Sequence, residues 1–225
     1  LPAALVGLLG AVAGSIVSTR LMQRFILKSN PELDAEISSE EGDEQKISFK
    51  SEGSAFLRFL NAILDGGKSG VEIGLAIIPG VLIISTVVMM LTFGPSADGS
   101  YTGAAYEGIA LLPYLAGKIN IVFEWLFGFE NPQLVSFPIT ALGAVGAALG
   151  LIPRFIQEGI INGNAIAVFT AMGMCWSGYL STHTAMLDSL GFRSLTSKAI
   201  LAHTVGGLVA GIAAHWLYVL LAWIF

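Results

Sequence analysis

The residues best suited to chemistry lie in one long apolar stretch, from Phe169 to Gly191. In hydrocarbon an unsatisfied polar group costs several kcal/mol, so polar side chains there are expected to face a protein interior or a water-filled cavity. The second half of the stretch carries seven such side chains: Ser177, Tyr179, Ser181, Thr182, His183, Thr184 and Asp188.

Four of these residues are spaced as one face of a helix. Ser177, Ser181, Thr184 and Asp188 stand at i, i+4, i+7 and i+11, which predicts a single polar stripe. Gly178 stands near the start of the stripe, where a helix can break. A broken intramembrane helix is typical of substrate sites in secondary transporters. The alternative is that the hydroxyls bond back to their own helix or to neighbouring helices.

Two groups of site residues follow from this pattern. Substrate binding is assigned to Ser177, Tyr179, Ser181, Thr182 and Thr184, and ion or proton coupling to Asp188, His183 and His203. Intramembrane ionisable groups often carry a proton or a coupling charge. Asp188 also has a second interpretation: near Arg193 and Lys198, it is a surface ion-pair partner at the membrane edge. A single histidine in a span is more often structural than functional, which is the alternative for His203.

The composition predicts an all-α polytopic membrane protein. The 225 residues are 54% hydrophobic and 12% charged, whereas soluble domains carry about 25% charged residues. We expect about four transmembrane helices, one re-entrant hairpin and interfacial amphipathic helices, in the cell inner membrane. A basic patch with interleaved aromatic residues is absent from the sequence, so nucleic acid is not an expected partner.

Enzyme and cofactor functions have little support in the sequence. Cys175 is the single cysteine, which excludes an internal disulfide and a CxxC metal site. No nucleophile–base pair, metal-ligand spacing or Gly-rich phosphate loop stands out. We therefore expect no catalytic residue, no metal and no cofactor beyond a coupling cation, Na⁺ or H⁺. The chain begins inside a hydrophobic run without Met, so we expect it to be the C-terminal part of a longer polypeptide, or a trimmed one.

The first third of the chain predicts three elements. A Gly- and Ala-rich transmembrane helix is expected at 1–22, because small residues allow close helix approach. An acidic loop follows at 23–53, and an interfacial amphipathic helix at 54–67, ended by Gly66-Gly67. Most basic residues share one side in this topology, so the segment 23–68 is expected to be cytoplasmic.

A transport core is expected at 68–225. Pro79-Gly80 predict a hinge or a packing kink within the first span of this core. His203, Gly207 and Gly211 predict a small-residue ridge in its last span. The elements are a span at 70–92, an aromatic amphipathic helix at 107–127, a re-entrant hairpin or a full span at 133–152, a broken helix at 165–190 and a last span at 199–225.

Four short stretches resemble one family of membrane proteins in the same order. They are Pro2-Ala3-Ala4-Leu5, Asp65-Gly66-Gly67-Lys68-Ser69-Gly70, the stretch from Cys175 through Ser181-Thr182 to Gly191, and Lys198-Ala199-Ile200-Leu201-Ala202-His203-Thr204. Together they resemble the C-terminal half of concentrative nucleoside transporters and of the related nucleoside-recognition (Gate-domain) membrane proteins.

The resemblance implies a cation-coupled carrier, often a homotrimer, that moves a small polar solute such as a nucleoside. In the family an Asn-Glu pair in a hairpin, and an Asn with paired hydroxyls on the next broken helix, hold the nucleoside. Ser181 and Thr182 match the hydroxyl pair, whereas Tyr179 stands in place of the helix Asn and Val145-Gly146 in place of Asn-Glu. These departures favour an alternative, a Gate-type module that binds a ligand or partner protein without transport.

Overall fold

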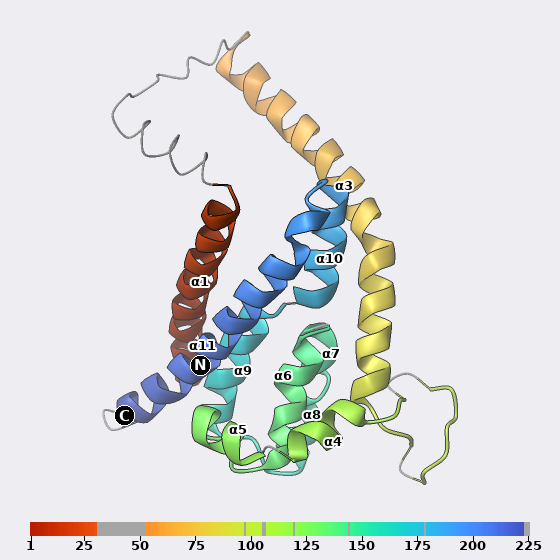
Figure 1. The fold of residues 1–225 in the computed structure, drawn as a ribbon, viewed down its shortest axis with the longest axis vertical. Helices are drawn as coiled ribbons and strands as arrows, with labels where there is room; N and C mark the ends of the chain where they lie inside the picture. Colours follow the sequence, from red (N-terminus) through yellow and green to blue (C-terminus); the bar gives the residue numbers. More distant parts are fainter. Residues whose placement is uncertain are drawn as a thin grey trace.

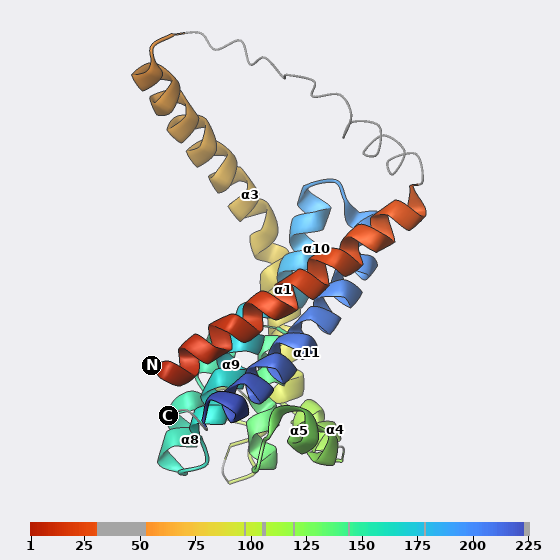
Figure 2. The same cartoon turned by 90° about the vertical axis from the view of Figure 1, so that its left-hand side faces the viewer.

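The computed structural model describes residues 1–30, 53–96, 98–104, 107–118, 120–143, 145–177 and 179–222. Within these residues every regular element is a helix, which confirms the predicted all-α class for the described part of the chain. Two helices there are long and apolar enough to cross a membrane, Pro2–Ser29 and Arg193–Leu221. Figures 1 and 2 show that the helices Pro2–Ser29 and Thr196–Leu221 run side by side, and that the short helices between residues 111 and 157 gather near one end.

Three helices pack most extensively on one another: α1 (Pro2–Ser29), α9 (Gly163–Cys175) and α11 (Thr196–Leu221). Proline suits the first turn of α1, because the N–H that it lacks has no partner inside the helix. The helix runs seven residues beyond the predicted end at 22 and includes Arg24 and Lys28. The acidic residues predicted to form a loop lie mostly at 31–52, outside the described residues.

Glycines set how closely these three helices approach. α1 and α11 run antiparallel (Figure 2), and a Cβ on Gly14 would lie 2.3 Å from the Gly206 carbonyl oxygen. A Cβ on Gly10 would lie 2.7 Å from the Ala210 carbonyl oxygen, and one on Gly7 2.5 Å from that of Ala167 on α9. Backbones this close require residues without side chains, which is typical of helix packing in membrane proteins.

The helix α3 (Ala55–Thr92) differs from the prediction, which had a separate interfacial helix at 54–67 and a span at 70–92. Ser54 caps its start by accepting a hydrogen bond from the Leu57 N–H at 3.3 Å. The helix then continues through Gly66-Gly67, which we expected to end an interfacial helix, and joins it to the predicted span at 70–92. Glycine only weakens a helix by about 1 kcal/mol, so an otherwise favourable sequence carries the helix across two of them. Figure 1 shows that the first half extends away from the bundle and that the second half lies beside α10.

The aromatic segment 107–127 is not one helix, contrary to the prediction. It contains α4 (Leu111–Gly117) and α5 (Asn120–Phe127), and Glu107 precedes both in a loop. The Glu107 carboxylate accepts hydrogen bonds from the Ser96 hydroxyl at 2.6 Å and from the Thr102 N–H at 2.9 Å. Glu107 therefore stabilises the loop between α3 and α4 through these hydrogen bonds. This explains why α4 starts at Leu111 and not at Glu107.

The predicted hairpin at 133–152 consists of short helices rather than one continuous span. The elements are η1 (Pro132–Val135), α6 (Ser136–Ala141), α7 (Val145–Leu149) and α8 (Ile152–Gln157). Re-entry into a membrane stays a prediction. Phe137 of α6 stacks on Phe169 of α9, with ring centroids 4.2 Å apart, so the segment is fastened to the core helix α9.

The predicted broken helix at 165–190 corresponds to α9 and α10 (Tyr179–Ser189). Asn162 caps the start of α9 by accepting a hydrogen bond from the Ala165 N–H at 2.8 Å. The helical turns stop at Cys175, and Trp176 and Ser177 form a turn before α10 begins. The short helix η2 (Arg193–Leu195) then leads into α11, which starts three residues before the predicted position of 199.

Candidate functional site: a histidine pair beside a helix break

The predicted substrate-binding hydroxyls do not form one continuous stripe. Ser177 lies in the turn before α10, exposed, and so is not on the same helix as Thr184. The Thr184 hydroxyl donates to the Leu180 carbonyl at 2.7 Å, so it bonds back to its own helix, as the alternative interpretation expected. The side chains of Tyr179, Ser181 and Thr182 lie outside the described part of the structure, although their backbone belongs to α10.

Asp188 lies at the end of α10 as a surface ion-pair partner. Its carboxylate is 2.7 Å from Nε of Arg193, and its second oxygen accepts a hydrogen bond from Nη2 at 3.0 Å. The Asp188 side chain is 49% exposed. This bidentate arrangement corresponds to the second interpretation given for Asp188 and occupies the group that coupling would require.

The two remaining coupling candidates are brought together from different helices. His183 of α10 and His203 of α11 lie with Nε2 and Nδ1 3.0 Å apart and with ring centroids 4.7 Å apart. Both residues are partly buried. Spacing along the chain does not reveal this pair, because twenty residues separate the two histidines.

The end of α9 holds His203 in place. The Trp176 indole N–H donates to the backbone carbonyl of His203 at 3.1 Å. Gly207 makes this contact possible, because a Cβ there would lie 1.9 Å from Nε1 of Trp176. The helix break therefore places Trp176, directly after α9, against His203, the residue of α11 that contacts His183 of α10.

This arrangement can hold and transfer a proton. One neutral imidazole can donate an N–H while the other accepts it, and a single added proton can be shared between the two nitrogens. A second proton would place two positive charges about 3 Å apart, which is strongly unfavourable outside bulk water. Any change in the distance between α10 and α11 therefore changes how well the pair holds a proton.

The predicted hinge residues Pro79 and Gly80 lie beside α10. Pro79 and Gly80 are inside the continuous helix α3, and a Cβ on Gly80 would lie 2.7 Å from the Cβ of Ala185 on α10. Gly80 thus has a packing role, the contact of α3 with α10. Movement about Pro79-Gly80 stays a prediction, and the third hinge candidate, Gly178, lies outside the described residues.

A large apolar pocket is lined by one of the polar candidates whose side chains are described, Ser177. It has a volume of about 740 Å³ and lies between α9 and the short helices α6 to α8. Its walls are apolar, including Phe137, Val145, Ile156 and Phe169, and Ser177 is one of its two hydroxyl-bearing lining residues. An apolar cavity suits an apolar occupant, so we place the chemistry at the histidine pair and not in this pocket.

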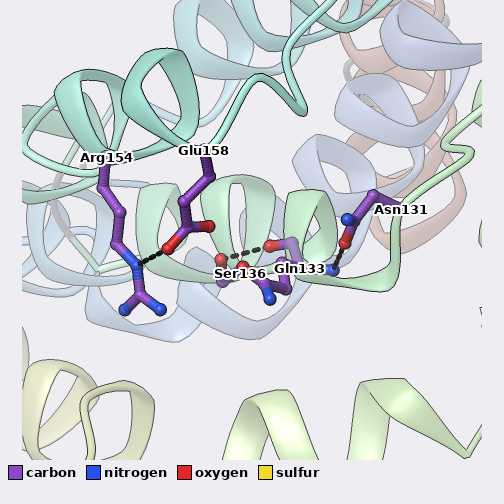
Figure 3. Close-up of polar contacts among 5 residues, drawn as sticks. All are labelled: Asn131, Gln133, Ser136, Arg154 and Glu158. Carbon is purple, nitrogen blue, oxygen red and sulfur yellow. Dashed lines mark hydrogen bonds and ion pairs between the residues drawn. The ribbon is translucent and has the colours of Figure 1, made fainter. Parts of the chain in front are cut away.

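A second polar group lies on the short helices and has local partners (Figure 3). Asn131 accepts a hydrogen bond from the Gln133 N–H at 2.9 Å, and the Ser136 hydroxyl donates to the Gln133 carbonyl at 2.5 Å. Arg154 of α8 (Ile152–Gln157) pairs at 2.7 Å with Glu158, the residue directly after the helix. These contacts join residues two to four positions apart, so they stabilise helix ends and turns and do not form a site.

The sequence interpretation missed a third polar centre, around Asn164. The Asn164 amide donates to the carbonyls of Phe127 and Gly128, at 2.8 and 3.1 Å, and its Oδ1 lies 2.8 Å from Nδ1 of His215. Asn164 is only 8% exposed. A polar residue directly after the Gly163 start of an apolar helix was the available signal, although nothing in the spacing pointed to His215.

Comparisons of the chain with protein-family models, with curated proteins and with solved structures find no match.

Proposed function

We propose that the chain belongs to a multi-pass membrane transporter that moves a small polar solute together with a proton or another cation. The observation that carries this proposal is the His183–His203 contact, at 3.0 Å, beside the break between α9 and α10. A polar pair that can hold a proton is costly inside a membrane, and such ionisable groups there are mostly functional. Broken helices supply the irregular backbone that lines substrate sites in secondary transporters.

Two features support membrane insertion. The helices α1 and α11 have the required length and apolar composition. Large apolar side chains are exposed along α1, among them Leu5, Leu9 and Ile16, each more than half exposed. In water such a surface would be unfavourable, whereas in a bilayer it contacts lipid. We therefore retain about four spans and a re-entrant hairpin at 133–152 as the proposed topology.

The solute is proposed to bind near the break, because the hydroxyl-bearing residues Ser177, Ser181 and Thr182 are close in sequence to the break and to His183. The resemblance to nucleoside transporters makes nucleosides the first solutes to test, and it makes a homotrimer the first assembly to test. A proton shared by His183 and His203 would then be the coupling charge.

The proposal can be tested by uptake into proteoliposomes that contain the purified full-length protein to which the chain belongs. The panel holds uridine, adenosine, uracil and serine, each driven by a pH gradient, by a sodium gradient or by neither. We expect gradient-dependent uptake of at least one solute, reduced at least tenfold in His183→Gln and in His203→Gln. Ser15→Ala is the matched control, because Ser15 is exposed on α1 and its hydroxyl bonds the Val12 carbonyl.

Two outcomes would contradict the proposal. One is an absence of gradient-driven uptake for every solute of the panel. The other is uptake that remains unchanged in both histidine variants, which would show that the pair is structural.

The second candidate is a Gate-type module that binds a partner without transport. The first half of α3 favours it, because Phe56 and Phe59 are 73% and 62% exposed and this half extends away from the other helices (Figure 1). This module predicts association with another membrane protein in the absence of uptake. Co-purification of a defined partner by wild type but not by Phe56→Ser/Phe59→Ser would support it.

A further inference from the structure

A second pocket lies at the far end of α11 from the histidine pair. His203 and His215 are twelve residues apart, which corresponds to about 18 Å along a helix. The pocket has a volume of about 700 Å³ and lies between α5, the start of α9 and the end of α11. Its lining includes Glu124, Trp125, Glu130, His215, Trp216 and Tyr218.

The charged side chains that line this pocket are acidic. Among the described residues of its lining, Glu124 and Glu130 are the charged ones, and none is Lys or Arg. The two carboxylates come from different places, one on α5 and the other on the segment that follows it. A pocket with two negative charges and no resident cation attracts a positively charged ligand.

Aromatic side chains form the other walls. Trp125 of α5 and Trp216 and Tyr218 of α11 line the same pocket, and the two tryptophans are 73% and 53% exposed. The face of an aromatic ring attracts a cation, and aromatic cages are used in proteins to bind quaternary ammonium groups. Small metal ions prefer clusters of oxygen or nitrogen ligands, and the described residues contain no group of three or more metal-binding side chains.

The buried side of the pocket is held by hydrogen bonds of Asn164 and His215. The Asn164 amide faces two backbone carbonyls, so its Oδ1 must accept from Nδ1–H of His215. In the neutral ring Nε2 is then an acceptor and not a donor. Gly128, with φ of 64°, lies against this histidine, and a Cβ there would lie 2.4 Å from Cε1 of His215. The floor thus adds an acceptor rather than a competing positive charge.

We propose that this pocket binds an organic ammonium group, held by Glu124 and Glu130 and by the faces of Trp125 and Trp216. The ammonium group can come from a free solute or from the headgroup of a zwitterionic lipid, because both present the same chemistry. This site does not depend on the proposed transport, since it shares no residue with the His183–His203 pair.

The test uses the full chain in dodecyl maltoside and phosphate buffer, because amine buffers would compete. One arm titrates choline chloride by calorimetry, beside its uncharged analogue 3,3-dimethyl-1-butanol. A second arm measures, by native mass spectrometry, the retention of dioleoylphosphatidylcholine against dioleoylphosphatidylglycerol. The variants are Glu124→Gln/Glu130→Gln and Trp216→Leu. Glu72→Gln is the matched control, since Glu72 is an exposed glutamate on α3, outside the pocket.

We expect saturable binding of choline or preferential retention of phosphatidylcholine. Either signal should fall at least tenfold in Glu124→Gln/Glu130→Gln and severalfold in Trp216→Leu, and should persist in Glu72→Gln. A response in the choline arm identifies a free solute, and a response only in the lipid arm identifies a headgroup.

Three results would overturn the proposal. They are an absence of binding in both arms, equal binding by wild type and Glu124→Gln/Glu130→Gln, and equal affinity for choline and its uncharged analogue. The glutamates are exposed and the change to Gln keeps their shape, so loss of folding is not expected to obscure the result.

Discussion

The two histidines of α11 have different partners, and this difference separates their roles. His203 contacts a second imidazole on another helix, at 3.0 Å, whereas His215 contacts the amide of Asn164, at 2.8 Å. An imidazole can gain or lose a proton in response to its partner, but an amide cannot. The amide of Asn164 is itself held by two carbonyls, so it fixes His215 in one tautomer.

The comparison indicates that the partner of each histidine, and not its position in an apolar span, is the basis for proposing a coupling role for His203 and a structural role for His215. Both histidines lie on one helix and both are partly buried. We therefore expect substitutions around His215 to act on stability, and substitutions of His183 or His203 to act mainly on transport.

The largest change in stability is expected at Gly207, which leaves room for the Trp176 indole to hydrogen-bond His203. In Gly207→Ala the new Cβ would lie 1.9 Å from Nε1 of Trp176, so the indole must move and lose its hydrogen bond to His203. Overpacking costs about 1–3 kcal/mol and the hydrogen bond about 1 kcal/mol, so we expect roughly 2–4 kcal/mol of destabilisation. Thermal unfolding in detergent measures the effect.

The control for this variant is Gly74→Ala, on α3, where a Cβ would meet no atom within 4 Å. Alanine is the better helix former, so the control should be neutral or slightly more stable than wild type. Equal destabilisation by both variants would show that Gly207 is not a contact point for Trp176.

The next largest change in stability is expected at Asn164, the partner of His215. Asn164→Ala removes the partner of His215 and of the Phe127 and Gly128 carbonyls. Leaving buried polar groups without partners should cost about 1–3 kcal/mol in unfolding free energy. Asn30→Ala, at the end of α1, should change stability much less, because its amide bonds back one turn to Ile26. Uptake that falls in Asn164→Ala without any loss of stability would contradict the structural role proposed for His215 and its partner Asn164.

A smaller effect is expected at Glu107, which also has a fixed hydrogen-bonding environment. Hydrogen bonds from Ser96 and Thr102 lower the pKa of Glu107 from 4.5 to about 2. A lowered pKa in the folded state contributes stability above pH 4.5, and this contribution is lost as the pH falls from about 4.5 to about 2. The advantage of wild type over Glu107→Gln in proteolytic resistance of the loop should therefore be full at pH 6 and shrink toward pH 3. An advantage that is the same at both pH values would contradict this role.

The smallest effect is expected at Asp188. Exposed ion pairs contribute about 0–1 kcal/mol, and the Asp188–Arg193 pair is at the surface. Asp188→Asn should therefore change thermal stability little and leave the pH dependence of uptake intact. Loss of that pH dependence would return Asp188 to the coupling role that the sequence first suggested.

The sequence predicted helix type better than helix boundaries. Hydrophobic content and small residues gave the all-α class and the Gly207–Gly211 ridge of α11, where Gly211 lies against Met172. The join across Gly66-Gly67 was missed because glycine was taken as a helix end, although it only weakens a helix by about 1 kcal/mol. The division of 107–127 was missed because local propensity does not include the hydrogen bonds of distant loop residues such as Ser96 with Glu107.

The candidate site was predictable in its members but not in its geometry. His183 and His203 were chosen because each is ionisable in an apolar stretch, yet their contact depends on how α10 packs against α11. Trp176 and Asn164 were missed, since their roles arise from backbone carbonyls that a sequence pattern does not display.

The most direct test of the central claim is thermal stabilisation of the purified chain by the solute panel, in wild type and in His183→Gln/His203→Gln. A solute at 100 times its Kd should add about 2.7 kcal/mol, or roughly 5–10 °C in apparent Tm for a chain of this size. We predict such a shift for at least one solute in wild type, and its loss in the double variant. The absence of a shift with every solute, or the same shift in both proteins, would contradict a solute site coupled to the histidine pair.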